Sequence, residues 1–214
     1  MSRFNSVVLD VDSTLSGIEG IDWLAKLRGT EVAAWSAALT DSAMRGEIPI
    51  EAVYGQRMRK VRPTESEIRQ LGNEYVDRIA PQARETLSAL KTAGVSVAMI
   101  SGGLRDAILP LARELGVEQQ SVHAVSVFFD RTGNYAGFEE GSPLTQQTGK
   151  KTTVARMGLK GPILAVGDGM TDCEMKSVVD SFAAFTGFTR REPVIDRADF
   201  VIETFDQLRE LVLQ

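Results

Sequence analysis

The residues of this chain best suited to chemistry are two aspartates, Asp10 and Asp12, which directly follow the apolar run 7–9. A single aspartate after a strand is usually a turn or a helix cap. Two carboxylates within three residues, followed by Ser13 and Thr14, can instead supply a nucleophile and a general acid–base at one place. We therefore interpret this segment as a candidate catalytic centre.

Two later apolar runs also end in polar residues. Run 95–100 leads into Ser101-Gly102-Gly103, and run 163–166 leads into Gly167-Asp168-Gly169-Met170-Thr171-Asp172. Glycines allow backbone N–H groups to approach an anion closely. Taken alone, each segment also fits an ordinary capped helix start or an Asp/Gly turn, so the prediction depends on whether the segments meet in space.

The three apolar runs have the length and composition of buried parallel strands. Helical patterns follow or precede them, so the chain alternates between the two kinds of element. Further strands are expected at 122–127, 181–185 and 200–202, helices at 81–93, 104–115, 173–179 and 206–213, and a hairpin at 128–138. This alternation predicts an α/β fold with a Rossmann-like parallel sheet. Ligands of such sheets bind at the carboxyl ends of the strands, where Asp10, Ser101 and Asp168 are expected to converge.

Residues 17–79 interrupt the alternation. They contain helical patterns at 21–27, 31–44 and 50–61 and a capping-box sequence at 64–67, with no strand-like run among them. We interpret 17–79 as an inserted helical cap over the carboxyl edge of the sheet, and 1–16 with 80–214 as the Rossmann-like catalytic core.

Composition limits the possible partners. The net charge of −5 makes extended nucleic-acid binding improbable on physical grounds, and no apolar stretch reaches the roughly 18 residues that span a bilayer. We therefore expect neither nucleic acid nor membrane as a partner. A single cysteine, Cys173, suits a reducing cytoplasm. With one histidine, His123, it cannot form the usual zinc cage, so a metal would be a hard, carboxylate-bound ion such as Mg²⁺ or Mn²⁺. The sequence leaves open a monomer or a homodimer.

The order of these segments resembles the four-motif set of the haloacid dehalogenase superfamily: Asp-x-Asp-x-Thr at 10–14, Ser101, a lysine, and Gly-Asp-Gly-x-x-Asp at 167–172. The stretches 19–25, 101–103 and 135–138 are similar to the phosphoserine phosphatase family within it. The resemblance covers the whole chain. It implies an Mg²⁺-dependent phosphomonoesterase that hydrolyses O-phosphoserine, a small phosphorylated amino acid, through an aspartyl-phosphate, as in serine biosynthesis.

The resemblance also implies roles for individual residues. Asp10 would be the nucleophile and Asp12 the acid–base catalyst. Mg²⁺ would be held by Asp10, the Asp12 backbone carbonyl, Asp168 and Asp172. The remaining residues would contact the substrate: Ser101, Gly102, Gly103, Lys150 and Thr171 around the phosphate, Glu19 at the ammonium, Arg57 at the carboxylate and Met44 along the pocket. The spacing from Ser101 and the preceding Gly149 favour Lys150 over Lys151 as the lysine of the motif set.

Two residues depart from the family pattern: Arg45 stands where a small residue is usual, and Thr171 replaces the more usual asparagine. Both bear on the substrate rather than on the reaction. Three alternatives remain open: a phosphatase or phosphotransferase for another small phosphorylated metabolite, a signalling receiver domain, and a catalytically inactive binding module. The receiver fits poorly, because its phosphorylated aspartate follows a later strand and no large cap is inserted.

Overall fold

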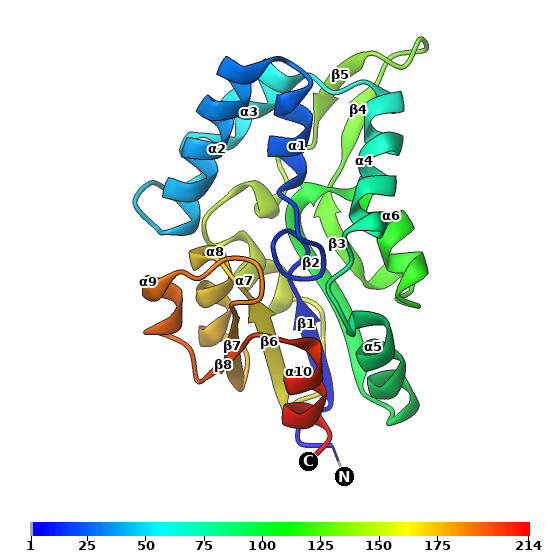
Figure 1. The fold of residues 1–214 in the computed structure, drawn as a ribbon, viewed down its shortest axis with the longest axis vertical. Coiled ribbons are helices and arrows are strands. Elements are labelled where there is room, and N and C mark those ends of the chain that lie inside the picture. Colours follow the sequence, from blue (N-terminus) through cyan, green and yellow to red (C-terminus); the bar gives the residue numbers. More distant parts are fainter. Residues whose placement is uncertain (1) are drawn as a thin grey trace.

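The computed structural model describes residues 2–214 and contains a six-stranded sheet in the order β3-β2-β1-β6-β7-β8, with every neighbouring pair parallel (Figure 1). The strands are β1 (Ser6–Leu9), β2 (Ser96–Leu104), β3 (Val122–Val125), β6 (Ile163–Gly167), β7 (Ser181–Phe185) and β8 (Phe200–Ile202). This confirms the predicted α/β, Rossmann-like parallel sheet.

Strand β1 lies in the middle of the sheet, and all four of its residues are buried. It pairs with β2 on one side and β6 on the other, so that Leu9 is in register with Met99 and Val166. The continuous apolar run suits a strand that is covered on both faces. The chain order reverses on the two sides of β1, and this switch point opens a crevice at the carboxyl ends of these strands.

Helices cover the sheet and its carboxyl edge. They are α1 (Gly20–Lys26), α2 (Thr30–Met44), α3 (Tyr54–Val61), α4 (Glu65–Asp77), α5 (Ala83–Thr92), α6 (Arg105–Glu114), α7 (Gly149–Val154), α8 (Met170–Cys173), α9 (Glu192–Ile195) and α10 (Phe205–Val212). The capping box predicted at 64–67 is present: Thr64 and Glu67 each bond the other's backbone N–H and fix the start of α4.

Between β1 and β2 the chain forms helices α1 to α5 and, within the described residues, no strand. Figure 1 shows α1, α2 and α3 grouped beyond the end of the sheet, whereas α4 runs beside α6. Gly72 allows α4 to pack closely against α6, because a Cβ at this position would lie 3.0 Å from the ring of Pro110. The end of the helical segment therefore packs on a core helix, and the cap boundaries at 17 and 79 stay a prediction.

The predicted hairpin is confirmed as the antiparallel pair β4 (Val127–Phe129) and β5 (Tyr135–Phe138). It contacts the helical segment at two places. The ring of Phe138 lies 5.4 Å from the ring of Tyr54, and the carbonyl of Gly133 accepts a hydrogen bond from the backbone of Glu65. The hairpin thus joins the helices that lie over the carboxyl edge.

Four predicted elements differ from the structure. The strand expected at 122–127 ends at Val125, and Val127 already belongs to β4 in the other sheet. The helix expected at 173–179 is wrong, because α8 already begins at Met170 and a 3₁₀ turn follows over Glu174–Ser177. The earlier start is stabilised by the Asp172 carboxylate, which accepts a hydrogen bond from the Gly169 N–H at 3.0 Å. The segment 50–61 divides into a 3₁₀ turn, Ile50–Ala52, and α3. Strand β2 extends through Ser101 to Leu104, beyond the predicted end.

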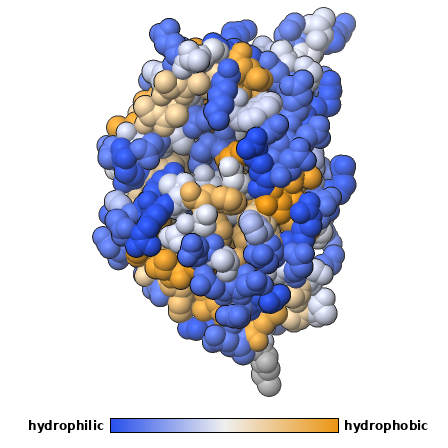
Figure 2. Space-filling view, in the orientation of Figure 1, coloured by the Kyte–Doolittle hydropathy of each residue, from blue (hydrophilic) through white to orange (hydrophobic). Residues whose placement is uncertain are grey.

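The face shown in Figure 2 is mostly hydrophilic, with apolar residues in small scattered patches. None of the helices formed by residues 2–214 combines the length and apolar content that a membrane-spanning helix needs.

Candidate active site

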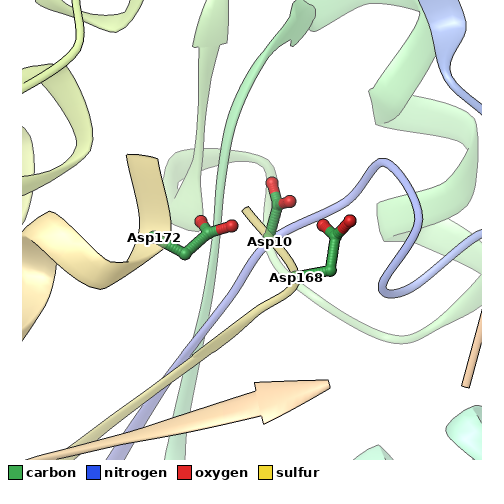
Figure 3. A group of neighbouring side chains, drawn as sticks. All are labelled: Asp10, Asp168 and Asp172. Carbon is green, nitrogen blue, oxygen red and sulfur yellow. The ribbon is translucent and has the colours of Figure 1, made fainter. Parts of the chain in front are cut away.

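Three aspartates meet at the carboxyl edge of the sheet. Asp10 directly follows β1, Asp168 directly follows β6, and Asp172 lies one helical turn further, in α8. One carboxylate oxygen from each lies within 4.8 Å of the others, and all three residues are buried (Figure 3). Asp10 and Asp168 therefore converge as their strand positions predict, and Ser101 lines the same pocket.

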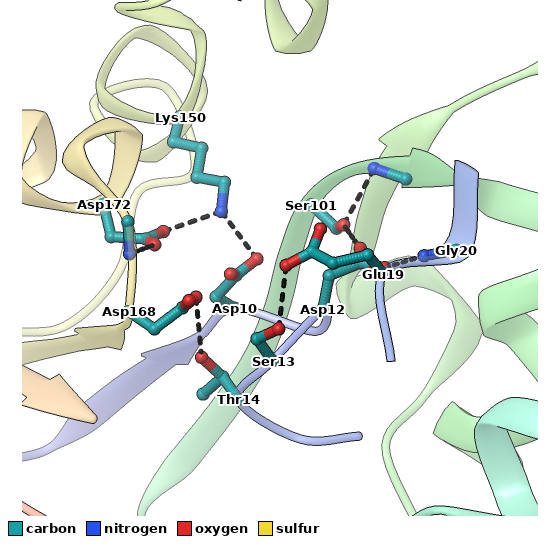
Figure 4. Close-up of polar contacts among 12 residues, drawn as sticks. Asp10, Asp12, Ser13, Thr14, Glu19, Gly20, Ser101, Lys150, Asp168 and Asp172 are labelled. Atoms are coloured by element: carbon teal, nitrogen blue, oxygen red, sulfur yellow. Dashed lines mark hydrogen bonds and ion pairs between the residues drawn. The ribbon is translucent and has the colours of Figure 1, made fainter. Parts of the chain in front are cut away.

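Lys150, from the start of α7, binds two of these carboxylates. Its Nζ lies 2.5 Å from Oδ1 of Asp10 and 2.7 Å from Oδ1 of Asp172 (Figure 4). Burial and the nearby Asp172 charge raise the pKa of Asp10, and Lys150 opposes this rise. Burial tends to lower the pKa of Lys150, but the two carboxylates outweigh it, so the pKa is raised and the amine stays charged. Lys150, the lysine that the sequence favours, thus contacts the predicted nucleophile.

Asp168 has a cationic partner that sequence analysis missed. The guanidinium of Arg191 forms an ion pair with its carboxylate, and both side chains are buried. On another side, the hydroxyl of Thr14 lies 3.5 Å from Oδ1 of Asp168. Arg191 precedes the short helix α9 and follows another arginine, so nothing in its sequence context distinguishes it from a surface residue.

The hydrogen bonds that Asp12 accepts come from neutral donors. Its Oδ1 accepts hydrogen bonds from the backbone N–H of Gly20 at 2.6 Å and from the hydroxyl of Tyr75 at 2.7 Å, and its Oδ2 accepts one from the hydroxyl of Ser101 at 3.0 Å. Its side chain lies outside the cluster of three aspartates. Sequence analysis did not identify Tyr75.

The segment Ser101-Gly102-Gly103 forms a bulge in β2 rather than a helix start. Between Ile100 and Leu104 the pairing with β3 shifts register. The N–H of Gly103 donates to the hydroxyl of Ser101 at 2.8 Å, and the carbonyl of Gly102 accepts the hydroxyl of Tyr54 at 2.8 Å. A Cβ at Gly103 would lie 2.9 Å from Oδ2 of Asp12, so a side chain there would displace that carboxylate.

The charged residues predicted to contact an amino acid lie next to the carboxylates. Glu19 is partly buried and accepts a hydrogen bond from Ser13 at 2.7 Å. Burial, followed by the charge of Asp12, raises its pKa to about 7. Arg57 is 4% exposed, and it is held by Asp22 at 2.8 Å and by Ser36 at 3.1 Å. Neither residue is the exposed surface charge that its position alone suggests.

All but one of the predicted site residues line a single open pocket of about 620 Å³. The lining includes Asp10, Asp12, Glu19, Met44, Arg57, Ser101, Gly102, Gly103, Lys150, Asp168 and Thr171. The exception is Asp172, which is fully buried beneath Lys150.

The two residues that depart from the family pattern lie in different surroundings. Within the described chain, the hydroxyl of Thr171 is buried and has no hydrogen-bond partner, although the residue lines the pocket. Arg45 lies outside the pocket lining, where its half-exposed side chain pairs with Asp41 and Glu47. The Arg45 side chain therefore does not enter the pocket.

The aspartate cluster fits a divalent cation. Asp10, Asp168 and Asp172 offer hard oxygen ligands at a spacing that one ion can bridge. Their three negative charges face two cationic side chains, Lys150 and Arg191, so a cation would balance the remaining charge. These aspartates would hold it, and its chemistry would be to neutralise charge on a bound phosphoryl group.

The chain matches the model of the haloacid dehalogenase-like hydrolase family over residues 4–177, and it belongs to that family. Phosphoserine phosphatases are among its curated relatives: it is 35% identical to that of Bos taurus over 207 residues, covering 95% of this chain and 91% of the relative. The Homo sapiens phosphoserine phosphatase is 34% identical with the same coverage. Within the hydrolases, the chain is thus a member of the phosphoserine phosphatase family.

A solved structure gives the same fold. The phosphoserine phosphohydrolase-like protein from Francisella tularensis superposes with a TM-score of 0.88 at 23% identity, over 97% of this chain and 99% of the other.

Proposed function

We propose that this protein hydrolyses O-phosphoserine to serine and phosphate through an aspartyl-phosphate on Asp10. The observation that carries the proposal is that Asp10 and Asp12 line one pocket but have different hydrogen-bond partners. Asp10 faces charged groups, with Lys150 at 2.5 Å, whereas Asp12 faces the neutral donors Gly20, Tyr75 and Ser101. Two carboxylates in unlike environments can take different roles in one reaction.

In the first step, a carboxylate oxygen of Asp10 attacks phosphorus and the bond between phosphorus and the serine oxygen breaks. Asp12, protonated at this stage, gives its proton to the departing oxygen. Lys150 orients the Asp10 carboxylate and opposes the rise in its pKa that burial causes. Splitting the reaction in two lowers a barrier that is among the highest known for uncatalysed hydrolysis.

In the second step, Asp12 is a carboxylate and takes a proton from water. The resulting hydroxide oxygen bonds to phosphorus, the acyl-phosphate bond breaks, and phosphate and free Asp10 are restored. Ser101 and Lys150 line the pocket beside Asp10 and are placed to hold phosphoryl oxygens. We propose Mg²⁺ as the cation held by the aspartate cluster.

The amino-acid part of the substrate is recognised by the other side of the pocket. Glu19 supplies an anion for the ammonium group, and Arg57 supplies a guanidinium for the carboxylate. Asp22 and Ser36 fix Arg57 in place before substrate binds. Met44 lines the same pocket and adds an apolar wall. Serine as the product, and the single Cys173, suit a cytoplasmic enzyme of serine biosynthesis.

Phosphate release from a panel of phosphomonoesters tests the proposal. L-phosphoserine, D-phosphoserine, phosphothreonine, glycerol phosphate and p-nitrophenyl phosphate are compared with Mg²⁺, Mn²⁺ or EDTA. L-phosphoserine is expected to give the highest kcat/KM, and EDTA to abolish turnover. A better non-amino-acid substrate would contradict the substrate assignment. Transfer of phosphate to added alcohols in place of water would favour a phosphotransferase.

A further inference from the structure

Tyr75 makes a contact that the proposed reaction does not yet use. It lies near the end of α4, is fully buried, and donates its hydroxyl to Oδ1 of Asp12 at 2.7 Å. It is not among the residues that line the pocket, so it reaches Asp12 from behind the site. Burial and the neighbouring Asp12 charge raise the pKa of Tyr75, and the phenol therefore stays a donor.

The two oxygens of Asp12 have different partners. Oδ1 accepts two hydrogen bonds, from Tyr75 and from the Gly20 N–H, and neither donor can accept a proton in return while it holds this geometry. Among residues 2–214, Oδ2 is hydrogen-bonded only to the hydroxyl of Ser101, at 3.0 Å. A hydroxyl can rotate toward a phosphoryl oxygen, which makes Oδ2 the oxygen that is free to carry and transfer a proton.

The absence of a side chain at Gly20 leaves room for the Tyr75 hydroxyl beside Asp12. A Cβ at Gly20 would lie 2.1 Å from the Tyr75 hydroxyl oxygen and 3.3 Å from Oδ1 of Asp12. A side chain at this position would displace the phenol. Helix α4 is in turn held against α6, where Gly72 lies close to Pro110, so the phenol is presented from a packed helix.

We propose that Tyr75 is a positioning residue that fixes the Asp12 carboxyl so that its proton is carried on Oδ2, toward the leaving group. The proposal rests on the acid–base role given to Asp12 in the proposed function. The effect is geometric, because Oδ1 remains an acceptor whether Asp12 is protonated or ionised. Without Tyr75, the carboxyl can turn and carry its proton on the wrong oxygen.

The test compares two leaving groups. Serine leaves as an alkoxide and needs a proton, whereas p-nitrophenolate is a stable anion and does not. The parameter kcat/KM reports the steps up to the first irreversible one, so it isolates departure of the leaving group. Tyr75→Phe is expected to lower kcat/KM for phosphoserine about tenfold and for p-nitrophenyl phosphate by less than about twofold.

Gly20→Ala provides a second, independent variant, because its methyl group pushes the phenol from Asp12 while the Gly20 backbone N–H remains. It is expected to give the same contrast between substrates, and the double variant should lose no more than the worse single variant. Thr86→Val is the control: it also removes a buried hydroxyl, which bonds the carbonyl of Phe205 and lies outside the pocket lining. Its two kcat/KM values are expected to change by the same factor.

Equal losses on both substrates in Tyr75→Phe and Gly20→Ala, or unchanged phosphoserine hydrolysis, would overturn the positioning role. If the wild-type enzyme does not hydrolyse phosphoserine, the proposed function fails separately. The alkyl phosphate that it hydrolyses best then replaces phosphoserine in the same comparison, and the Tyr75 proposal is still tested.

Discussion

The Nζ of Lys150 lies 2.5 Å from Oδ1 of Asp10, although 140 residues separate the two in the chain. Asp10 is placed by the central strand β1 and Lys150 by the first turn of α7. The same amine lies 2.7 Å from Asp172, so one cation joins the end of β1 to helix α8. The negative charge of the proposed nucleophile is thus compensated from a distant part of the chain.

Replacing Lys150 by methionine is expected to lower kcat for phosphoserine by at least about 100-fold, because Asp10 loses its charge partner and a phosphoryl group loses a cation. The free energy of unfolding measured in EDTA should also fall by about 3–5 kcal/mol, since Asp10 and Asp172 are left buried without the cation that pairs them. Urea unfolding measures the second effect. Lys151→Met is the matched control, and an equal loss in that variant would show that Lys150 has no special role.

Glu19 is expected to make substrate binding depend on pH. Its pKa of about 7 means that the carboxylate needed for the ammonium group forms only as the pH rises through that value. For phosphoserine, kcat/KM should therefore increase as the pH rises through about 7. The increase should be larger than that for p-nitrophenyl phosphate, which has no ammonium group. Glu19→Gln should remove this extra rise. An unchanged phosphoserine profile in Glu19→Gln would contradict the assignment.

The same raised pKa has a consequence for stability. The folded protein binds the Glu19 proton more tightly than the unfolded chain, whose carboxyl has its ordinary value of 4.5. The stabilisation is complete below about pH 4.5 and is lost as the pH rises through about 7. Glu19→Gln should therefore raise Tm more at pH 8 than at pH 5. Thermal unfolding of both proteins across this range measures the difference, and a constant Tm difference would argue against it.

Arg57 is expected to bind the substrate carboxylate with the planar fork of its guanidinium. Arg57→Lys keeps the positive charge near Asp22 but cannot make the same paired hydrogen bonds, so KM for phosphoserine should rise about tenfold or more. KM for p-nitrophenyl phosphate should hardly change. The control is Arg59→Lys, at an exposed position on the same helix. Equal changes for both substrates would argue against carboxylate recognition.

Thr171 is expected to contact the substrate through its unpartnered hydroxyl. Thr171→Val keeps the shape and removes the hydroxyl, and KM for phosphoserine should rise about fivefold to tenfold, the equivalent of one hydrogen bond. Stability should be unchanged or higher, because the buried hydroxyl has no partner in the described protein. Thr171→Ser, which keeps the hydroxyl, should retain a KM near that of the wild type. Similar KM values for all three proteins would contradict a substrate contact.

The sequence predicts much of the site because the chemistry lies at the ends of strands. Asp10, Ser101 and Asp168 each follow a buried apolar run, and parallel strands bring such positions to one edge. Tyr75 and Arg191 could not be found in this way. In the sequence, Tyr75 looks like an ordinary residue of the apolar face of α4, and Arg191 lies in a loop. Their contacts with the site depend on how α4 and that loop pack against the sheet.

Local boundaries were less predictable than the order of elements. The start of α8 depends on a hydrogen bond from Gly169 to the Asp172 side chain, which turns a motif residue into a cap. The extension of β2 depends on a bulge at Ser101–Gly103, after which β2 resumes its pairing with β3 at Leu104. Both features arise from contacts that a hydrophobic pattern does not encode.

The most direct test of the account is to trap the phosphorylated enzyme. Wild-type protein is mixed with ³²P-labelled phosphoserine and Mg²⁺, quenched in acid within the first turnover, and digested for peptide mapping. The label is expected on the peptide that contains Asp10, and Asp10→Asn is expected to show neither label nor phosphate release. Turnover without any labelled Asp10 peptide, or near wild-type turnover by Asp10→Asn, would contradict the central claim.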